Sequence, residues 1–562
     1  MNTIRINRRA VVLALLCLVG IALFVLSMMP SSSEENMHSL GQKILLARDI
    51  NARTNFPQQE HNLEKGYSAE NTSVEMVLLH DDDGGKVTSN DSAISDGESR
   101  RFIRRMMLHA WNGYKKYAWG ENEVQPIAKK AYSQGIFGGA GSGLAATMVD
   151  GLDTLFIMGL TDEYIEARNY LKKNFDITHV SGSLSVFETN IRFLGGMLSA
   201  YALTGEHFYI DKAKSIGDVL LKAFNTQTGI PKSSLNPSSG QISNYGWANG
   251  GSSILAEFGS LHLEFTYLSV ITGNTVYREK VQAIRDHLDR IEKIGGLYPN
   301  YLSADSGTWT GTHVSLGAMG DSFYEYLIKS YIQSNKNDTQ AWRMYTETID
   351  AIEKQMVRKS KGGLTYVAEW RNGILEHKMG HLACFCVGMF ALQSRLESDP
   401  EKAKRIMNLA EEIGNTCHES YVRSKTGLGP EMFYFTSDDE AKAIVGEHGY
   451  ILRPEVIEGW FYLWRLTGKP IYKEWVWAAI QAIEKYCKKE GGYAGLVNVY
   501  DASGGSDDVQ QSFFLAETLK YAYLTFTDAS IVSLDDWVFN TEAHPLPILR
   551  KLHPIRHLVK QT

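Results

Sequence analysis

The sequence lacks the features that mark nucleic-acid-binding proteins. Its 562 residues carry a net charge of −7 and contain no Lys/Arg-rich cluster and no nucleic-acid motif. Because binding to a phosphate backbone needs clustered positive charge, no nucleic acid is expected as a partner.

The chain also has few segments with the pattern of a β-strand. No linker interrupts its last 450 or so residues, which is long for one domain. Aromatic residues make up 11% of the chain, which over that length is enough to build a large core. These absences favour one large, all-α domain.

One long apolar run, residues 10–29, follows Arg5, Arg8 and Arg9. Its length suits a helix that crosses a bilayer, and the basic flank keeps residues 1–9 on the cytosolic side as a short tail. A cleaved signal peptide is the alternative, but the run is long for one and no small-x-small cleavage site ends it. The sequence therefore predicts a transmembrane signal anchor and a single-pass type II membrane protein.

Residues 30–99 are polar and show no stable hydrophobic period, which predicts a flexible lumenal stem. Three Asn-x-Ser/Thr sites, at Asn71, Asn90 and Asn337, are open to glycosylation on that side. The main domain is expected over residues 100–550, followed by a C-terminal tail, residues 551–562.

A Thr-Gly-x-x-x-Tyr pattern recurs at residues 204–209, 272–277 and 467–472. Each copy follows an apolar, helix-like stretch, and each glycine suits the position just past a helix end. The first two glycines are 68 residues apart, and the third lies 195 residues further on, about three units of 65. A unit of that length fits two helices with their loops, and about seven such units fill the domain. The sequence predicts a closed ring of helical hairpins; an open solenoid is the alternative.

Each of these apolar segments begins near an acidic residue. Glu188, Glu257 and Glu455 precede the three glycines by 17, 16 and 13 residues. At roughly 1.5 Å per residue, parallel inner helices would bring these carboxylates to one rim of the ring. Asp321 and Glu517 open similar apolar-aromatic segments. Clustered carboxylates with facing aromatics and few lysines are what a glycosidase or a hard-cation site needs.

Five longer motifs carry a resemblance to a known family. They are residues 148–155 (MVDGLDTL), 186–192 (VFETNIR), 452–455 (LRPE), 512–518 (SFFLAET) and 539–545 (FNTEAHP). Through them the main domain resembles the class I α-1,2-mannosidases of glycoside hydrolase family 47. The fold of that family is a toroid of seven helical hairpins, (α/α)7, which agrees with the repeat count.

The resemblance implies calcium-dependent hydrolysis, with inversion, of terminal α-1,2-linked mannose on oligomannose N-glycans. Inversion needs an acid and a base on opposite faces of the sugar, about 6.5–9.5 Å apart. By position, Glu188 matches the general acid, acting through a water, and Glu455 matches the base. Asp321 belongs to the same catalytic set. Glu431, in residues 428–431 (LGPE), is a second acid candidate, and sequence does not decide between the two carboxyls.

The resemblance also implies where the ion and the sugar bind. Thr541 matches the direct protein ligand of calcium, and Glu517 and Glu542 match acids that hold its water shell. Phe513 matches an aromatic residue that packs against the sugar. Read without the family, Thr541 is an ordinary cap or turn residue and Phe513 a core residue. The other expected substrate-binding residues are Arg192, His381, Arg453 and Met319.

Five cysteines are present. Cys17 lies in the predicted anchor. The resemblance implies a disulfide between Cys384 and Cys417, and the lumen permits oxidation. Cys386 and Cys487 match no family pair, so buried free thiols and a further bridge are both open.

One position separates branches of the family. The endoplasmic reticulum branch carries Arg two residues before the Asp of its Asp-Ser-Tyr-Tyr-Glu-Tyr segment, whereas this chain has Met319 two residues before Asp321. Residues 245–253 (YGWANGGSS) and 509–512 (VQQS) also resemble the Golgi branch. The resemblance therefore implies a Golgi membrane location, with the endoplasmic reticulum less favoured.

Two other functions, a binding protein and a structural protein, are alternatives to the enzyme. The first is a lectin-like relative that binds mannose glycans on misfolded proteins and sorts them for degradation; such relatives lack the pair Cys384 and Cys417. The second is a helical scaffold without activity, which leaves the carboxylates at the rim unexplained.

Overall fold

The computed structural model describes residues 95–549 except 140, 437–439 and 445. The predicted cytosolic tail, the anchor, most of the stem and the C-terminal tail lie outside the described residues, as do Cys17, Asn71 and Asn90. In the part that is described, no helix is long and apolar enough to cross a membrane. The first helix, α3 (Asp96–Tyr117), begins inside the range predicted as stem, and Ser95 and Glu98 cap it with reciprocal hydrogen bonds.

Helices dominate the fold, and they pair. Within the described residues, seven inner helices each contact an outer helix. The inner helices are α4 (Ala146–Ile157), α7 (Gly195–Thr204), α10 (His262–Thr272), α12 (Asp321–Gln333), α14 (Cys386–Leu396), α16 (Glu455–Thr467) and α18 (Leu519–Thr525). Their outer partners, in the same order, are α5 (Thr161–Asn174), α8 (Phe208–Leu220), α11 (Val276–Arg290), α13 (Thr339–Gln355), α15 (Pro400–Val422), α17 (Ile471–Tyr486) and α3.

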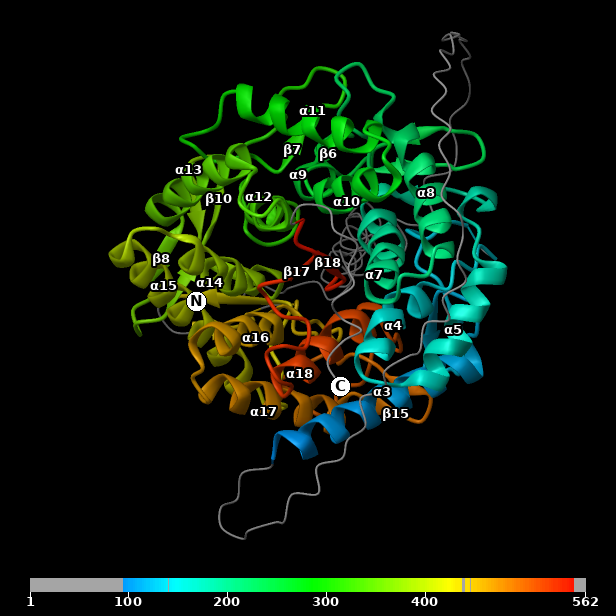
Figure 1. Cartoon of the computed structure of the whole chain (residues 1–562). Helices are drawn as coiled ribbons and strands as arrows, with labels where there is room; N and C mark the ends of the chain where they lie inside the picture. Colours follow the sequence, from blue (N-terminus) through cyan, green and yellow to red (C-terminus); the bar gives the residue numbers. More distant parts are fainter. Residues whose placement is uncertain (1–94, 140, 437–439, 445, 550–562) are drawn as a thin grey trace, which may run out of the picture. The chain divides into compact units, whose positions relative to one another are not determined.

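The pairs close on themselves. Each inner helix contacts the next, and the short π-helical segment η5 (Phe514–Thr518), which leads into α18, contacts α4. The described helices therefore follow one another around a ring (Figure 1). The sequence prediction of a mostly helical, closed arrangement is confirmed, and the open solenoid is not what the structure shows.

The three Thr-Gly-x-x-x-Tyr repeats form turns between paired helices, as predicted. Gly205, Gly273 and Gly468 follow the ends of α7, α10 and α16, with left-handed φ values of 75°, 71° and 67°. In each repeat the threonine hydroxyl donates to the carbonyl four residues back and accepts the N–H two residues ahead. The tyrosine of each repeat is buried in the outer helix that follows.

Inner and outer helices differ in how they are buried. The residues of α16 from Glu455 to Leu463 are all buried, whereas α13 buries one stripe at helical spacing. A helix buried on every side lies within the core, and a helix with one apolar stripe lies on the outside. Charged side chains on the inner helices are therefore removed from water and need partners.

The all-α prediction is incomplete, because short antiparallel strands accompany the helices. Sequence patterning missed them because a strand of two to four residues is too short to show an alternation. They pair as β1 (Glu123–Gln125) with β2 (Lys130–Tyr132), β4 (Ser234–Leu235) with β3 (Leu184–Ser185) and β5 (Ile242–Ser243), β6 (Ser253–Ile254) with β7 (Tyr301–Leu302), β8 (Val357–Lys359) with β9 (Thr365–Val367), β10 (Glu369–Arg371) with β11 (Ile374–Glu376), β13 (Met432–Phe435) with β12 (Lys378–Gly380) and β14 (Glu440–Lys442), β15 (Lys488–Lys489) with β16 (Gly492–Tyr493), and β17 (Trp537–Phe539) with β18 (Pro545–Pro547).

One of these hairpins lies against the inner helices. β17 contacts α12 and β18 contacts α7, and Figure 1 shows the two strands inside the ring. The residues that join them, 540–544, are therefore held among the inner helices. Short helical segments complete the fold: α6 (Val186–Glu188), α9 (Leu255–Phe258), η1 (Ile177–His179), η2 (Thr189–Leu194), η3 (Leu221–Phe224) and η4 (Leu382–Phe385).

Candidate active site

Glu455, the predicted base, is the first residue of α16. Its Oε2 lies 2.7 Å from His381 Nδ1, and its Oε1 lies 3.6 Å from Arg453 Nη1. Burial raises the pKa of this carboxyl, but the hydrogen bond with His381 and the positive charge of Arg453 outweigh burial, so the pKa of Glu455 is lowered. Glu455 is therefore ionised at neutral pH, which is the state that a general base needs.

Asp321 is the first residue of α12, and its pKa is raised, whereas that of Glu455 is lowered. Burial is the main cause that raises its pKa; the backbone N–H of Ser322, which donates to Asp321 Oδ1 at 2.8 Å, opposes it, and the charges of Glu325 and Glu455 raise it again. The resulting pKa is about 7. Neighbouring carboxyls whose pKa values are pushed apart form an acid–base pair, so Asp321 can hold a proton at a pH where Glu455 has lost its own.

Glu188 ends α6, and Arg192 lies one turn later in η2, a π-helical segment of the kind that is often found at functional sites. Arg192 Nε donates to Glu188 Oε2 at 2.7 Å, and its Nη1 donates to Asp150 at 3.0 Å and also to Glu542. The guanidinium lies 5.8 Å from the centroid of the Phe513 ring. One buried arginine thus joins three carboxylates and places the expected sugar-packing ring beside the expected acid.

Glu431, the second acid candidate, is bound on two sides. Arg453 Nε lies 2.8 Å from both of its carboxylate oxygens, and its main-chain carbonyl accepts the His381 N–H at 2.9 Å. Leu452, which precedes Arg453, has a left-handed φ of 68°, a conformation that is strained for a non-glycine residue. Both neighbours of the predicted base, His381 and Arg453, are therefore held by Glu431.

The predicted carboxylates form one electrostatically connected group. The charge of Glu188 raises the pKa of Glu257 and of Glu542. The charges of Glu542 and Glu455 raise the pKa of Glu517, and that of Glu455 also raises the pKa of Asp321. These acids come from α9, α6, the 540–544 segment, η5, α16 and α12. The structure thus brings together the acids that the sequence placed at one rim.

Thr541, the expected calcium ligand, lies in the 540–544 segment, where its N–H donates to the Tyr326 hydroxyl at 3.4 Å. Across the described residues, no group of three or more His, Cys, Asp or Glu side chains is arranged to hold a metal. The local charge nevertheless suits a cation. Burial raises the pKa of Glu517 and of Glu542 well above the usual value. The charge of Glu542 raises the pKa of Glu517 further, whereas Arg192 opposes the rise at Glu542 without cancelling it. A hard cation beside the oxygens of Thr541 would relieve that repulsion, so the residues present fit such an ion.

Met319 lies next to the 245–253 segment, another part of the sequence that resembles one branch of the family. It has a left-handed φ of 75°, and its carbonyl accepts the Ala256 N–H at 2.9 Å. It packs with Ala248 and Tyr245 of the 245–253 segment against Ala256. A pocket of about 380 Å³ opens beside it, lined by residues that include His313, Glu369 and Arg371. Two features that resemble the Golgi branch are therefore neighbours in space.

Comparison with known proteins now decides the family. Residues 106–548 match glycosyl hydrolase family 47. The chain belongs to this family. It is 51% identical over 98% of its length, and 100% of the relative's, to a mannosyl-oligosaccharide 1,2-alpha-mannosidase of Caenorhabditis elegans, and 52% identical over 83% of its length, and 72% of the relative's, to mannosyl-oligosaccharide 1,2-alpha-mannosidase IB of Homo sapiens.

A solved structure supports the same fold. The alpha-1,2-mannosidase from Trichoderma reesei is 28% identical and superposes with a TM-score of 0.74 over 81% of this chain and 100% of its own. The protein is thus a glycosidase of family 47, with a helical barrel.

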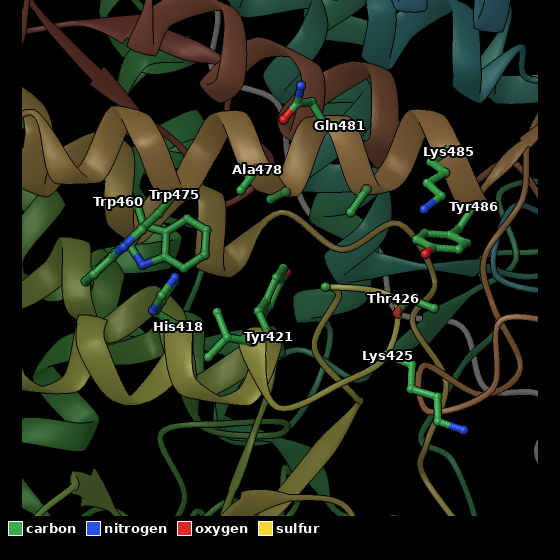
Figure 2. Close-up of a pocket in the computed structure, with 14 residues that line it drawn as sticks. His418, Tyr421, Lys425, Thr426, Trp460, Trp475, Ala478, Gln481, Lys485 and Tyr486 are labelled. Carbon is green, nitrogen blue, oxygen red and sulfur yellow. The ribbon is translucent and has the colours of Figure 1, made fainter. Parts of the chain in front are cut away.

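A second pocket, of about 300 Å³, lies outside the family 47 carboxylate group. Residues of α15 and α17 line it, with His418 stacked on Trp475 at 4.1 Å between ring centroids (Figure 2). Tyr421 and Tyr486 contribute further aromatic surface. Tyr421 also lies within hydrogen-bonding distance of His381, the partner of the predicted base, so this pocket adjoins the candidate active site on its outer side.

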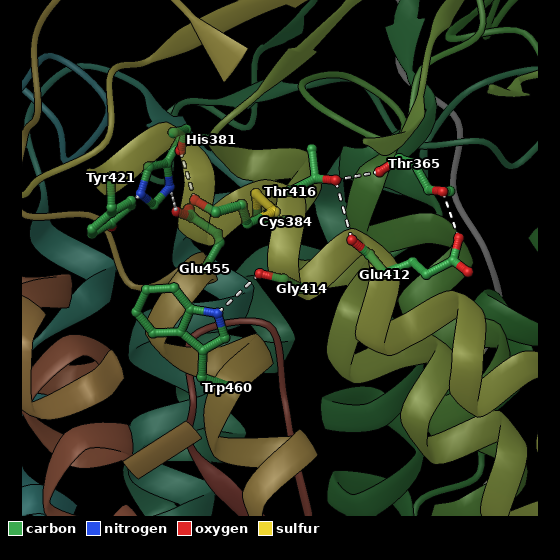
Figure 3. Close-up of a disulfide and its surroundings, with 11 residues drawn as sticks. Thr365, His381, Cys384, Glu412, Gly414, Thr416, Tyr421, Glu455 and Trp460 are labelled. Atoms are coloured by element: carbon green, nitrogen blue, oxygen red, sulfur yellow. Dashed lines mark hydrogen bonds and ion pairs between the residues drawn. A yellow bond between two sulfur atoms is a disulfide. The ribbon is translucent and has the colours of Figure 1, made fainter. Parts of the chain in front are cut away.

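The disulfide that the resemblance to family 47 implied is present. Cys384, in η4, is bonded to Cys417, in α15 (Figure 3). It ties the segment that follows His381 to the outer helix that carries Tyr421. Cys386 and Cys487 are buried free thiols, which settles the alternative left open by the sequence for the described residues.

Sequence reasoning missed several buried charges that support the family 47 site. Asp153, on α4, lies 2.8 Å from Lys520 Nζ and 2.7 Å from His544 Nδ1, with all three side chains fully buried. Asp150, one turn earlier on the same helix, accepts from Arg192. Two aspartates in the otherwise apolar stretch 148–155 were the available signal, because an apolar inner helix carries acids only where they have partners.

Helical spacing was a second missed signal. Glu325 lies four residues after Asp321, and Glu458 lies three residues after Glu455, so each shares a helix face with a predicted acid. Glu325 is ion-paired with Lys329. Burial raises the pKa of Glu458, Lys329 opposes the rise, and Glu325 and Glu455 add to it.

Proposed function

We propose that this chain hydrolyses terminal α-1,2-linked mannose from oligomannose N-glycans, with inversion at the released sugar. The observation that carries the proposal is the ionised Glu455 beside the protonatable Asp321, in a chain 51% identical over 98% of its length to a mannosyl-oligosaccharide 1,2-alpha-mannosidase. The seven described hairpins support assignment to the (α/α)7 barrel.

In this proposal Glu455 accepts the proton of the water that attacks the anomeric carbon, and an acid protonates the departing glycosidic oxygen. Asp321 has the pKa that suits a proton donor near neutral pH. Glu188 and Glu431 are the other donor candidates, and each has its carboxylate in an ion pair with an arginine. The residues proposed to line the sugar pocket are Arg192, His381, Arg453, Phe513 and Met319.

Calcium is the ion that we propose for the site, because the available donors are oxygens. Thr541 would bind it directly through its hydroxyl and carbonyl oxygens, while Glu517 and Glu542 would hold its water ligands. When bound, the ion would supply positive charge next to the sugar hydroxyls and the attacking water.

The cellular setting is proposed from the sequence. Residues 10–29 would anchor the chain as a single-pass type II protein in the Golgi membrane, with the stem and the domain lumenal. The disulfide between Cys384 and Cys417 suits an oxidising compartment. Asn337 is exposed in the turn between α12 and α13, where a glycan could be attached. Protease protection of tagged chains in sealed Golgi and endoplasmic reticulum vesicles would test both the topology and the compartment.

The activity is tested with purified full-length protein in detergent and a labelled oligomannose glycan of nine mannoses. We expect stepwise release of mannose in the presence of calcium, and NMR of the released sugar should show β-mannose first, because hydrolysis inverts the α-linkage. Glycan binding without release would favour the lectin-like reading. If the protein neither binds nor cleaves the glycan, the scaffold is favoured. Release of α-mannose first would contradict inversion.

A further inference from the structure

Tyr421 of α15 lies on the side of His381 opposite the base. Its hydroxyl oxygen is 2.7 Å from His381 Nε2, and His381 Nδ1 is 2.7 Å from Glu455 Oε2 (Figure 3). The Tyr421 side chain is 2% exposed and that of His381 is 1% exposed, so no bulk water replaces either hydrogen bond. The three groups form an unbroken line from the outer helix to the carboxylate.

We infer that Tyr421 is a positioning residue for catalysis: its hydroxyl hydrogen selects the His381 tautomer that donates to Glu455. The inference rests on the proposed role of Glu455 as the base. Tyr421 does not touch the reacting sugar in this arrangement and acts only through His381.

The tautomer follows from proton counting. Ionised Glu455 has no hydrogen to give, so His381 Nδ1 must carry the hydrogen of that contact. A neutral imidazole has one ring hydrogen, so its Nε2 is an acceptor and needs a donor. Tyr421 is that donor, because burial and the charge of Glu455 raise the pKa of its hydroxyl well above the usual value and keep it protonated. This is the logic by which a buried partner fixes a catalytic histidine in other hydrolases.

Other groups around this line do not supply the same hydrogen. Tyr450, whose ring lies 5.9 Å from that of His381, donates its hydroxyl hydrogen to the Arg453 carbonyl at 3.0 Å. Glu431 accepts the main-chain N–H of His381 through its own main-chain carbonyl, while its carboxylate accepts from Arg453 and has no hydrogen to give. Glu431 acts on Arg453. The titratable and charged groups that interact with Glu455 itself are His381, Arg453, Tyr421, Tyr450, Asp321, Glu458 and Glu517.

The fold gives Tyr421 a fixed position and the experiment a matched control. Cys417, one turn before Tyr421, is bonded to Cys384, three residues after His381, so α15 and η4 are joined next to the contact. On its other side Tyr421 lines the outer pocket together with Tyr486 (Figure 2). Tyr486→Phe removes a hydroxyl from the same pocket without a contact to His381.

The test compares Tyr421→Phe with Tyr486→Phe and the unaltered protein in the full-length chain. Tyr421→Phe keeps the ring and removes the donor, so His381 can adopt the other tautomer and present a lone pair to Glu455. The hydrogen bond that lowers the pKa of Glu455 is then lost, and that pKa rises. We expect kcat to fall by about 10-fold to 100-fold, by analogy with other lost supporting partners, with KM little changed.

The pH profile separates positioning from a general loss of structure. Because the base works only when ionised, a higher pKa of Glu455 moves the acid limb of the profile to higher pH in Tyr421→Phe. Tyr486→Phe should retain the limb and kcat of the unaltered protein. An unmoved limb in a folded Tyr421→Phe variant, verified by its thermal unfolding, would overturn the inference.

A second measurement needs no variant and no activity. Nitrogen NMR of ¹⁵N-histidine-labelled protein, with the His381 signal assigned by loss in His381→Gln, should show a neutral ring protonated at Nδ1. A ring protonated at Nε2, or at both nitrogens, near neutral pH would contradict the inference. If the unaltered protein releases no mannose, the proposed function fails, whereas this signal still reports on the tautomer.

Discussion

Arg453 forms a forked ion pair with Glu431, with its Nε 2.8 Å from both carboxylate oxygens and its Nη2 2.7 Å from Oε2. The same guanidinium reaches Glu455 at a longer distance, 3.6 Å. Arg453 is therefore held mainly by Glu431, which leaves Glu455 under its positive field without a close ion pair. That arrangement keeps the proposed base ionised and leaves its Oε1 without a close ion pair from Arg453, which would compete with an attacking water for that oxygen.

The first prediction concerns Glu455→Gln. The change preserves shape but removes the base, so turnover should fall by about 10²-fold to 10⁴-fold with glycan affinity nearly intact. Turnover is measured by mannose release, and affinity by calorimetry with an oligomannose glycan. Near-normal turnover in the purified variant would remove Glu455 from its proposed role.

The second prediction concerns the alkaline limb of the activity profile. A donor must be protonated, so a group with a pKa of about 7 loses its function as the pH rises through that value. Activity of the unaltered protein should therefore decline above about pH 7, and Asp321→Asn should lower kcat by about 10²-fold to 10⁴-fold and abolish this limb.

Glu188→Gln and Glu431→Gln are the matched comparisons for that assignment. Both also exchange a carboxylate for an amide, and both should leave the alkaline limb in place. If Glu188→Gln or Glu431→Gln erases the alkaline limb and Asp321→Asn retains it, the proton donor is the glutamate whose substitution erased the limb.

The sequence pattern predicts the local turns and the grouping of the acids, but not their pKa values. The turn at Gly205 was predictable, because a left-handed residue after a helix needs little beyond its local sequence. The meeting of acids from different hairpins followed from the repeat, since parallel inner helices align their first turns. The pKa of Asp321 was out of reach, because it depends on burial and on Glu455, which only tertiary packing brings close, and not on its helix neighbour Glu325 alone.

The same limit explains the missed partners of the site. Tyr421 stands in an ordinary amphipathic helix, and its contact with His381 spans 40 residues of sequence. Arg192 was expected as a pocket residue on family resemblance alone, but its three carboxylate partners come from α4, α6 and the 540–544 segment. Contacts of this kind exist only once the ring has closed.

The third prediction concerns calcium. Exhaustive chelation should abolish activity and lower the melting temperature, because an ion that binds only the folded state stabilises it by about 2.7 kcal/mol at 100 times its Kd. Readdition of calcium should restore both, and magnesium should not, because it prefers a smaller and stricter shell. Full activity in protein shown by metal analysis to be calcium-free would contradict the proposal.

Two controls sharpen that test. Thr541→Ala removes the hydroxyl and keeps the carbonyl, so half-maximal activity should need more calcium, whereas Thr541→Ser should behave like the unaltered protein. The raised pKa values of Glu517 and Glu542 mean that the folded protein binds more protons than the unfolded one. The free energy of unfolding of the calcium-free protein should therefore fall as the pH rises above the ordinary glutamate value, and calcium should reduce this loss.

The fourth prediction is that Met319 sets how many mannoses are removed. An arginine there could donate forked hydrogen bonds to the hydroxyls of one glycan branch and favour a single bound pose. Methionine offers no donor and is flexible, so several branches can occupy the pocket beside it. The unaltered protein should trim most outer α-1,2-mannoses, and Met319→Arg should restrict trimming to one or a few.

Met319→Leu is the matched control for that prediction. All three side chains meet the same left-handed backbone at φ 75°, so backbone strain does not distinguish them, and only arginine adds donors. Product profiles over time are compared at equal rates of removal of the first mannose. We expect the Leu variant to follow the unaltered protein and the Arg variant to stop early. If all three profiles coincide, Met319 only packs against Ala248 and Tyr245, and branch choice must lie in the surrounding segments such as 245–253.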